Sequence, residues 1–228
     1  MSTLYIVGTP IGNLEDISLR ALRILKEVDF ILCEDTRVTK RLLDHYGIQT
    51  PTLSYHQHSK LQKIQEIGDL LGKGKNLALV SDAGTPGISD PGNKLVAEIA
   101  KTIPEVRIVP IPGASATSAV ASIAGLSMDR FLFLGFPPQK NKRKKFFEEV
   151  AASKYPVILY ESPHRILKTL KELEAINATL QVVVARELTK KFETTYRGTV
   201  SQVIEQLQND SLKGEFVIVV SHEKSVNP

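Results

Sequence analysis

Three segments rich in glycine and proline have a composition suited to binding a polar ligand through the backbone. They are residues 8–13, 81–92 and 110–116, and each lies at the end of an apolar run. Glycine permits a positive φ and a close backbone approach, whereas proline holds a loop shape without supplying a donor. Such loops can present N–H and C=O groups to a flat ligand such as adenine. Tight strand–helix turns without a ligand remain the alternative for any one of them.

A run of cations could bind nucleic-acid phosphate. It consists of Lys140, Lys142, Arg143, Lys144 and Lys145. Each phosphate contact releases counterions, so affinity depends on salt with a slope of about −0.7 per contact for single strands. Phe146, Phe147 and Tyr196 could stack a base. The alternatives are a solvated helix face for the cations and a core position for the aromatic residues.

Three other features of the sequence give weaker indications of a functional site. His56 and His58 share a strand face, but no third residue at a familiar spacing completes a zinc site, so we expect no metal. Cys33 lies in an apolar run and is expected to be a small buried side chain. Adjacent strand residues point to opposite faces, so Glu34 and Asp35 cannot serve one site as a carboxylate pair without a bend.

The common nucleotide-binding fingerprints are missing from the sequence. The first turn lacks the spacing G-x-G-x-x-G, and no segment matches G-x-x-x-x-G-K-[ST]. A dinucleotide-binding Rossmann enzyme and a P-loop NTPase are therefore disfavoured.

The elements that must position these residues alternate between strands and helices. Short apolar runs predict strands at residues 4–7, 30–33, 51–56, 76–81, 106–111, 131–135, 157–160, 181–185 and 216–220. Helical spacing predicts helices at about residues 17–28, 38–45, 61–71, 94–101, 142–152, 166–175 and 201–208. Residues 192–200 suit an antiparallel strand. The alternation predicts an α/β fold with mostly parallel sheets, whose ligands bind at the carboxyl ends of strands.

Composition and charge indicate two domains. The chain has 228 residues and a single cysteine, which excludes an intrachain disulfide scaffold and favours a reducing, cytoplasmic location. No apolar run reaches the roughly 20 residues that cross a bilayer, so no membrane association is expected. Residues 1–129 hold 13 Lys/Arg against 14 Asp/Glu, and residues 130–228 hold 16 against 11. We expect a neutral domain at 1–129, a basic domain at 130–228 and a cleft between them.

The order of the motifs resembles the tetrapyrrole (corrin/porphyrin) methylase superfamily, beginning with residues 7–13 and 16–21. Further motifs are similar to one branch, the ribosomal RNA small subunit methyltransferase I family, which methylates the ribose 2′-hydroxyl of a cytidine in the decoding region of 16S rRNA. They lie at residues 34–37, 81–92, 112–116, 133–138, 161–165 and 185–190. Many members carry a further C-terminal segment that is not in this sequence, so no RNA contact from it is expected.

The resemblance implies S-adenosylmethionine as the cofactor, bound in a cleft between two α/β domains. The first loop would pack on the cofactor and the second would line its amino-acid and sulfonium end. The implied cofactor-binding residues are Pro10, Ile11, Gly84, Thr85, Pro86, Ile88, Ser115, Ala116, Glu161, Ser162, Ala185, Gly214, Glu215 and Phe216. The last three would hold adenine through backbone groups.

The chemistry that the resemblance implies is an in-line attack of the ribose oxygen on the sulfonium methyl group. A positioned base adds roughly 10²–10⁴-fold to such a step. We hypothesise that Glu187 or Lys190 accepts or orients the hydroxyl proton, with Arg37 holding phosphate. An ion pair of Glu187 with Arg186 or Lys190 is the alternative. The expected RNA-binding residues are Lys140, Lys142, Arg143, Lys144, Lys145, Arg165, Lys191 and Arg197.

The resemblance also implies a homodimer that acts on 16S rRNA or on the 30S subunit. A methylase of the same superfamily that acts on a porphyrin or corrin precursor is the alternative enzyme. A ribosome-assembly protein that binds RNA without turnover is the alternative outside the enzymes.

Overall fold

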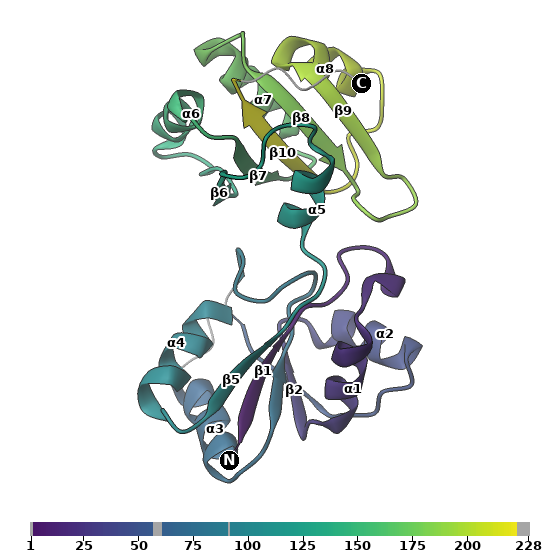
Figure 1. The fold of residues 1–228 in the computed structure, drawn as a ribbon, viewed down its shortest axis with the longest axis vertical. Helices are drawn as coiled ribbons and strands as arrows, with labels where there is room; N and C mark the ends of the chain where they lie inside the picture. The colour runs from purple at the N-terminus through teal and green to yellow at the C-terminus, as the bar shows by residue number, and fades with distance from the viewer. Residues whose placement is uncertain (1, 57–60, 91, 223–228) are drawn as a thin grey trace. The chain divides into compact units, whose positions relative to one another are not determined.

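The computed structural model of the chain describes residues 2–56, 61–90 and 92–222. The chain divides into two compact units, Met1–Ser115 and Ala116–Pro228 (Figure 1). Each of the strands and helices predicted above has a counterpart in the described residues. None of the described helices is long and apolar enough to cross a membrane.

The first unit is built on a five-stranded sheet in the order β3-β2-β4-β1-β5, in which every paired strand is parallel. The strands are β1 (Thr3–Val7), β2 (Phe30–Cys33), β3 (Thr52–Ser54), β4 (Leu77–Leu79) and β5 (Arg107–Ile111). The helices are η1 (Leu14–Asp16), α1 (Leu19–Glu27), α2 (Thr36–His45), α3 (Leu61–Gly72) and α4 (Gly92–Thr102).

Both faces of this sheet are covered, as the prediction of a parallel sheet requires. Helices α1 and α2 lie on one face and α3 and α4 on the other (Figure 1). Alternate strand residues enter the two cores, so that Val7 packs with the α1–α2 side and Leu4 with the α3–α4 side. The carboxyl ends of all five strands meet at one edge, where the glycine-rich loops begin.

The second unit holds a five-stranded sheet in the order β6-β7-β10-β8-β9. Its strands are β6 (Leu132–Gly135), β7 (Val157–Glu161), β8 (Gln181–Arg186), β9 (Thr194–Thr199) and β10 (Phe216–Ser221). Its helices are α5 (Ala116–Ile123), α6 (Arg143–Ala152), α7 (Ile166–Ile176) and α8 (Val200–Gln208).

The direction of the strands in this second sheet corrects the sequence prediction. Only β6 and β7 pair in parallel, whereas β10 runs antiparallel to both β7 and β8, and β9 runs antiparallel to β8. The prediction of mostly parallel sheets is therefore right for the first unit and wrong for the second. Because the last strand of the chain inserts between β7 and β8, two strands that flank a helix in sequence are not neighbours in the sheet. The antiparallel strand expected within residues 192–200 is confirmed as β9.

The boundary between the units also lies earlier than the predicted position after residue 129. Residues 116–123 form α5, which contacts β10 and belongs to the second unit. The hydroxyls of Thr117 and Tyr160 are 2.8 Å apart, and the Ile123 carbonyl accepts a hydrogen bond from Arg197. With the boundary after Ser115, residues 1–115 hold 13 Lys/Arg against 13 Asp/Glu, so the excess of cations stays entirely in the second unit.

Side-chain caps set where several helices begin. Ser18 accepts a hydrogen bond from the Ala21 N–H at the start of α1, and Asp35 accepts one from the Arg37 N–H at the start of α2. Thr199 and Gln202 form a complete capping box at the start of α8. Asp35 therefore fixes the point at which the chain leaves β2 and enters the candidate site.

Candidate functional site

The loops after β1 and β5 are locked together by two glycines. The Gly8 N–H donates to the Ile111 carbonyl at 3.0 Å. A Cβ on Gly113 would lie 2.6 Å from the Gly8 carbonyl oxygen, and a Cβ on Gly8 would lie 2.8 Å from the Gly113 Cα. Because the obstacle is backbone on both sides, only glycine fits at either position.

The loop after β4 is hydrogen-bonded to both the loop after β1 and the loop after β5. Thr9 and Gly84 exchange backbone hydrogen bonds of 2.9 and 3.1 Å, and the Thr9 hydroxyl donates to the Ser81 carbonyl at 3.2 Å. The Thr85 hydroxyl donates to the Ala114 carbonyl at 3.2 Å. The structure thus brings the three predicted loops together at one edge of one sheet.

The predicted cofactor residues of these loops differ in exposure. Ile11, Gly84 and Pro86 are buried, Pro10, Thr85 and Ser115 are half-buried, and Ile88 is exposed. Gly84 has a φ of +80°, which an L side chain rarely adopts. The loops at this edge of the sheet therefore present backbone, small side chains and the exposed Ile88. The buried residues Ile11, Gly84 and Pro86 can contribute only through their backbone and their packing.

Asp90 fixes the far end of the long loop. Its Oδ1 accepts hydrogen bonds from the Gly87 N–H at 2.7 Å and from the Gly92 N–H at 2.8 Å, at the start of α4. The Asn93 side chain donates to the Gly87 carbonyl. A loop tied to its own helix in this way keeps its shape without a ligand, which is the pre-organisation that a binding site needs.

The carboxylates at the end of β2 do not form a catalytic pair. Burial raises the pKa of Glu34, and the nearby carboxylates of Asp82 and Asp90 raise it further. Asp35 instead accepts hydrogen bonds from Arg37 Nε at 3.0 Å and Nη2 at 2.7 Å, which hold the pKa of its carboxyl well below the usual range. Arg37, expected to hold phosphate, is 87% exposed and already bound to Asp35 by this two-point contact.

In the second unit, Glu187 and Lys190 meet at the end of β8. Glu187 Oε1 accepts from Lys190 Nζ at 2.9 Å and from the Glu215 N–H at 2.9 Å. Lys190 Nζ also donates to Glu215 Oε2 at 2.8 Å. The ion pair of Glu187 with Lys190, one of the two alternatives left open by the sequence, is present.

The backbone around this cluster is strained. Glu187 and Thr189 have φ values of 53° and 67°, in the left-handed region that is costly for residues other than glycine. Gly214 has a φ of 110°, and a Cβ there would overlap the Glu187 side chain. Strain of this kind costs about 1–3 kcal/mol per residue and is found mostly where function requires a fixed geometry.

The protonation states of the pair follow from these contacts. Burial raises the pKa of the Glu187 carboxyl, but hydrogen bonds from Lys190 and from the Glu215 N–H outweigh it and the pKa is lowered. Burial alone would lower the pKa of the Lys190 ammonium, whereas the carboxylates of Glu215 and Glu187 outweigh burial and raise it. Near neutral pH, Glu187 is therefore an acceptor and Lys190 a donor.

Arg143, predicted to bind RNA, is instead a structural residue. Its side chain is only 6% exposed, and Nη1 donates to the Pro138 carbonyl at 2.8 Å. Nη2 donates to the Thr169 hydroxyl at 2.6 Å, and Nε to Glu172 Oε2 at 2.6 Å. The prediction for Arg143 is wrong, because this cation lies on the buried face of α6.

Beside Arg143 lies Glu161, whose side chain is fully buried and whose Oε2 is 3.9 Å from Arg143 Nη2. Its oxygens accept from the Thr169 hydroxyl at 2.6 Å and the Ser162 N–H at 2.8 Å, and Arg165 Nε lies 2.9 Å away. All the contacts of this carboxylate are thus internal. Glu161, implied as a cofactor residue, cannot reach a ligand through its side chain in this arrangement.

The other residues predicted in the second unit fall into two groups. Lys140, Lys142, Lys144, Lys145, Lys191 and Arg197 are exposed, and Arg165 is half-buried against Glu161. Ala185 and Phe216 are buried within adjacent strands, and the Glu215 carbonyl accepts from the Glu187 N–H at 2.9 Å. Phe147 and Tyr196 belong to the core, and Phe146 packs against it, so the alternative of core positions holds for these aromatic residues.

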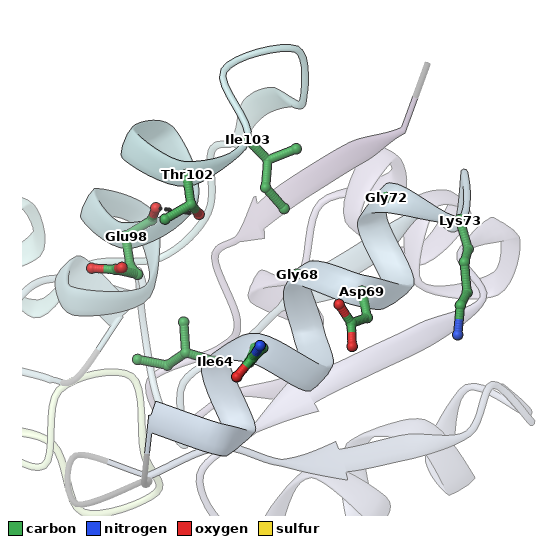
Figure 2. Close-up of a pocket in the computed structure, with 9 residues that line it drawn as sticks. Ile64, Gly68, Asp69, Gly72, Lys73, Glu98, Thr102 and Ile103 are labelled. Carbon is green, nitrogen blue, oxygen red and sulfur yellow. Dashed lines mark hydrogen bonds between the residues drawn. The ribbon is translucent and has the colours of Figure 1, made fainter.

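The remaining features of the first unit carry no predicted site residue. No cluster of three or more His, Cys, Asp and Glu suited to a metal ion occurs among the described residues, and His58 lies outside them. Cys33 is buried, as expected. A groove of about 810 Å³ lies between α3 and α4. Its lining includes Ile64, Gly68 and Ile103 (Figure 2).

Comparison with known proteins identifies the class first. The profile of the family Tetrapyrrole (Corrin/Porphyrin) Methylases matches residues 3–204. A solved structure of a cobalt precorrin-4 methyltransferase has a TM-score of 0.71 and 19% identity, covering 99% of this chain and 96% of its own. A uroporphyrin-III-C-methyltransferase from Thermus thermophilus has a TM-score of 0.62 and 17% identity, covering 96% and 94%. At such identities the two structures establish the fold alone, which is that of the tetrapyrrole methylases.

Relatives in sequence define the branch. Proteins from Synechocystis and Bacillus subtilis named Ribosomal RNA small subunit methyltransferase I are each 46% identical, over 97% and 96% of this chain and 79% and 75% of their own. A Hydrogenobaculum protein of the same name is 47% identical over 98% of this chain and 97% of its own. The chain belongs to the ribosomal RNA small subunit methyltransferase I family of tetrapyrrole methylases.

The interlock of Gly8 and Gly113 yields a test of the loop edge. Gly113→Ala is expected to lower the free energy of unfolding by about 1–3 kcal/mol, because a methyl group cannot enter between two backbones without moving them. The measurement is urea denaturation followed by circular dichroism. Gly72→Ala is the matched control, since a Cβ there meets nothing within 4 Å and the helix gains from alanine. Equal midpoints for Gly113→Ala and the wild type would refute the interlock.

Proposed function

We propose that this protein transfers a methyl group from S-adenosylmethionine to the ribose 2′-hydroxyl of a cytidine in the decoding region of 16S rRNA. The observation that carries the proposal is the 46–47% identity, over 96–98% of the chain, to proteins named Ribosomal RNA small subunit methyltransferase I. A cytoplasmic homodimer acting on the rRNA or the 30S subunit is part of the same proposal.

The loop edge of the first unit suits the cofactor. S-adenosylmethionine, the methyl donor of the tetrapyrrole methylases, supplies an electrophilic methyl group on a sulfonium when it is bound. The joined loops offer backbone polar groups for its amino-acid part and the exposed Ile88 for an apolar contact. In this proposal Pro10, Thr85 and Ser115 line the site, while Ile11, Gly84 and Pro86 support it from beneath.

The positions implied as cofactor-binding in the second unit can act mainly through their backbone. Ala185 and Phe216 have buried side chains, and Gly214 has none, so peptide groups are what these positions can offer to adenine. Ser162 keeps a half-buried side chain. The role of Glu161 becomes that of a support, since its carboxylate is fully used within the protein.

Glu187 is the better proton acceptor of the pair proposed for catalysis. During transfer the ribose oxygen gains a methyl group and loses its proton, so an ionised acceptor near the hydroxyl favours the attack. The hydrogen bonds from Lys190 and from the Glu215 N–H both go to Glu187 Oε1. Oε2 is the oxygen that can accept from the ribose hydroxyl, while the protonated Lys190 holds the carboxylate in place.

The exposed cations of the second unit support an RNA substrate over a small one. Four lysines between residues 140 and 145 point to solvent, and only Lys144 has an ion pair, at 3.8 Å to Glu148, among the described residues. A methylase acting on a porphyrin precursor does not need such a surface. A protein that binds rRNA without turnover would share the surface but not the transfer.

A labelling experiment tests the proposal directly. Small ribosomal subunits that lack the modification are incubated with the protein and with S-adenosylmethionine carrying a labelled methyl group. We expect label in 16S rRNA at the 2′-oxygen of one cytidine of the decoding region, located by mass spectrometry of nuclease fragments. Cofactor binding by calorimetry without any labelled RNA would favour the non-catalytic alternative. Labelling of a porphyrin precursor instead of RNA would favour the small-molecule methylase.

The catalytic assignment is tested by two substitutions. With cofactor at saturation, Glu187→Gln and Lys190→Ala are each expected to lower kcat by about 10²-fold or more, because the proton acceptor is lost or released from its position. Glu205→Gln, which removes an exposed carboxylate on α8, serves as the control and should leave kcat unchanged. Full turnover in both Glu187→Gln and Lys190→Ala would overturn the assignment.

The surface lysines are tested through the salt dependence of RNA binding. Replacing all four lysines by serine is expected to make the negative slope of log affinity against log salt less steep by about 3, because each phosphate contact contributes about −0.7. The substituted residues are Lys140, Lys142, Lys144 and Lys145. A control variant replaces four exposed lysines of the first unit, namely Lys26, Lys73, Lys75 and Lys101. An unchanged slope in the first variant would show that this surface does not bind the RNA.

A further inference from the structure

Three aromatic rings of the second unit form a cluster that the functional assignment does not use. The Tyr160 ring lies between Phe133 and Phe136, with centroid distances of 4.9 and 5.5 Å and interplanar angles of 64° and 66°. Both contacts are edge-to-face, the favourable arrangement of aromatic pairs. The Tyr160 hydroxyl is also held, 2.8 Å from the Thr117 hydroxyl.

Phe136 is the exposed member of this cluster. It is 52% exposed, whereas Phe133 and Tyr160 are half-buried. The edge contact to Tyr160 restrains the Phe136 ring and leaves about half of its surface open. A restrained aromatic ring with open surface can stack an unpaired nucleobase.

The segment after Phe136 connects the ring to the lysines. Two prolines follow, and the Pro138 carbonyl accepts the 2.8 Å hydrogen bond from Arg143 Nη1. Arg143 is itself anchored to Thr169 and Glu172. The chain between Pro138 and the start of α6 is thus closed by a hydrogen bond, and the exposed Lys140 and Lys142 lie within it.

Three other aromatic residues of the second unit are less suited to stacking. Phe147 and Tyr196 are core residues with almost no exposed surface. Phe192 is 66% exposed, but no contact with another ring restrains it among the described residues, and Lys191 Nζ lies over one of its faces, 5.6 Å from the ring centroid. Phe136 therefore combines exposure, a restraining ring contact and cations close by in the sequence.

We propose that Phe136 is a stacking site for an unpaired nucleobase of the RNA substrate, with Lys140 and Lys142 holding the adjacent phosphates. This inference rests on the proposed function and extends it by naming a base-binding position. Stacking accepts any of the four bases, because every base has a π face. The site would therefore select unpaired RNA near the target nucleotide and not a particular base. A protein partner covering the same exposed ring is the competing occupant.

Affinity and its salt dependence separate stacking from charge. Phe136→Leu is expected to weaken binding of unmodified small subunits about five- to 150-fold, the range for loss of one base–aromatic stack. Its slope against log salt should stay that of the wild type, because the phosphate contacts remain. Phe136→Tyr should bind like the wild type, and Phe192→Leu is the matched control at another exposed ring. Unchanged affinity in Phe136→Leu would overturn the inference.

A fluorescence experiment observes the stack itself. The chain contains no tryptophan, so Phe136→Trp introduces a single reporter. A single-stranded oligoribonucleotide of the decoding-region sequence should quench it, and an oligomer of the same length with abasic sites should not. Phe192→Trp is the matched reporter and should not be quenched. Quenching in the Phe192→Trp variant alone would move the site away from Phe136 and overturn the inference.

Two further outcomes separate this inference from the proposed function. Methylation by the wild type with unimpaired binding by Phe136→Leu overturns only the stacking site. Absence of any RNA binding and methylation by the wild type overturns both. Sedimentation of Phe136→Leu checks the competing occupant, because a change in oligomeric state with unchanged RNA affinity would show that Phe136 contacts protein instead of RNA.

Discussion

The packing of the second unit depends on the hydrogen bonds and the ion pair of one buried carboxylate, that of Glu161. A charge removed from water must be paired, and Glu161 is satisfied by Arg165, Thr169 and the Ser162 N–H, with Arg143 bound to the same threonine. Removing one partner from a buried pair of this kind costs about 3–5 kcal/mol. The network joins the end of β7 to α6 and α7. It holds Arg143 and Arg165 within the fold, whereas the lysines between residues 140 and 145 face solvent.

This sorting of the cations could be predicted only in part. A run of five basic residues looks uniform in sequence, and exposure holds for its four lysines. Arg143 nevertheless lies at helical spacing from Phe147, Val150 and Ala151, all of which are buried. That spacing is the signal that sequence reasoning missed. The partners of Arg143 could not be deduced, because Thr169 and Glu172 lie on another helix, α7, far away in the sequence.

The fold, too, could be predicted only in part from the sequence. Alternation of strands and helices predicts the first sheet well, since parallel neighbours need a helix between them. The same alternation in the second unit conceals an antiparallel arrangement, because β10 arrives last in sequence and pairs between β7 and β8. Helix α5 is absent from the prediction because its Ala- and Ser-rich sequence has a weak apolar face, with Val120 its only buried residue. Local patterns therefore predict the elements, whereas strand order depends on contacts distant in sequence.

If Glu187 and Lys190 act on the ribose hydroxyl as proposed, the contacts at the end of β8 define the kind of help they give. Glu187 has a lowered pKa and Lys190 a raised one, so neither is tuned toward neutral pH as a strong general base would be. What the cluster offers is position, through the strained backbone at Glu187 and Thr189 and through Gly214, where a Cβ would overlap the Glu187 side chain. Orientation of two reactants is worth up to about 7–11 kcal/mol, more than a base alone supplies. A fixed acceptor for the hydroxyl hydrogen fits that larger contribution, because it aligns the ribose oxygen before the proton leaves.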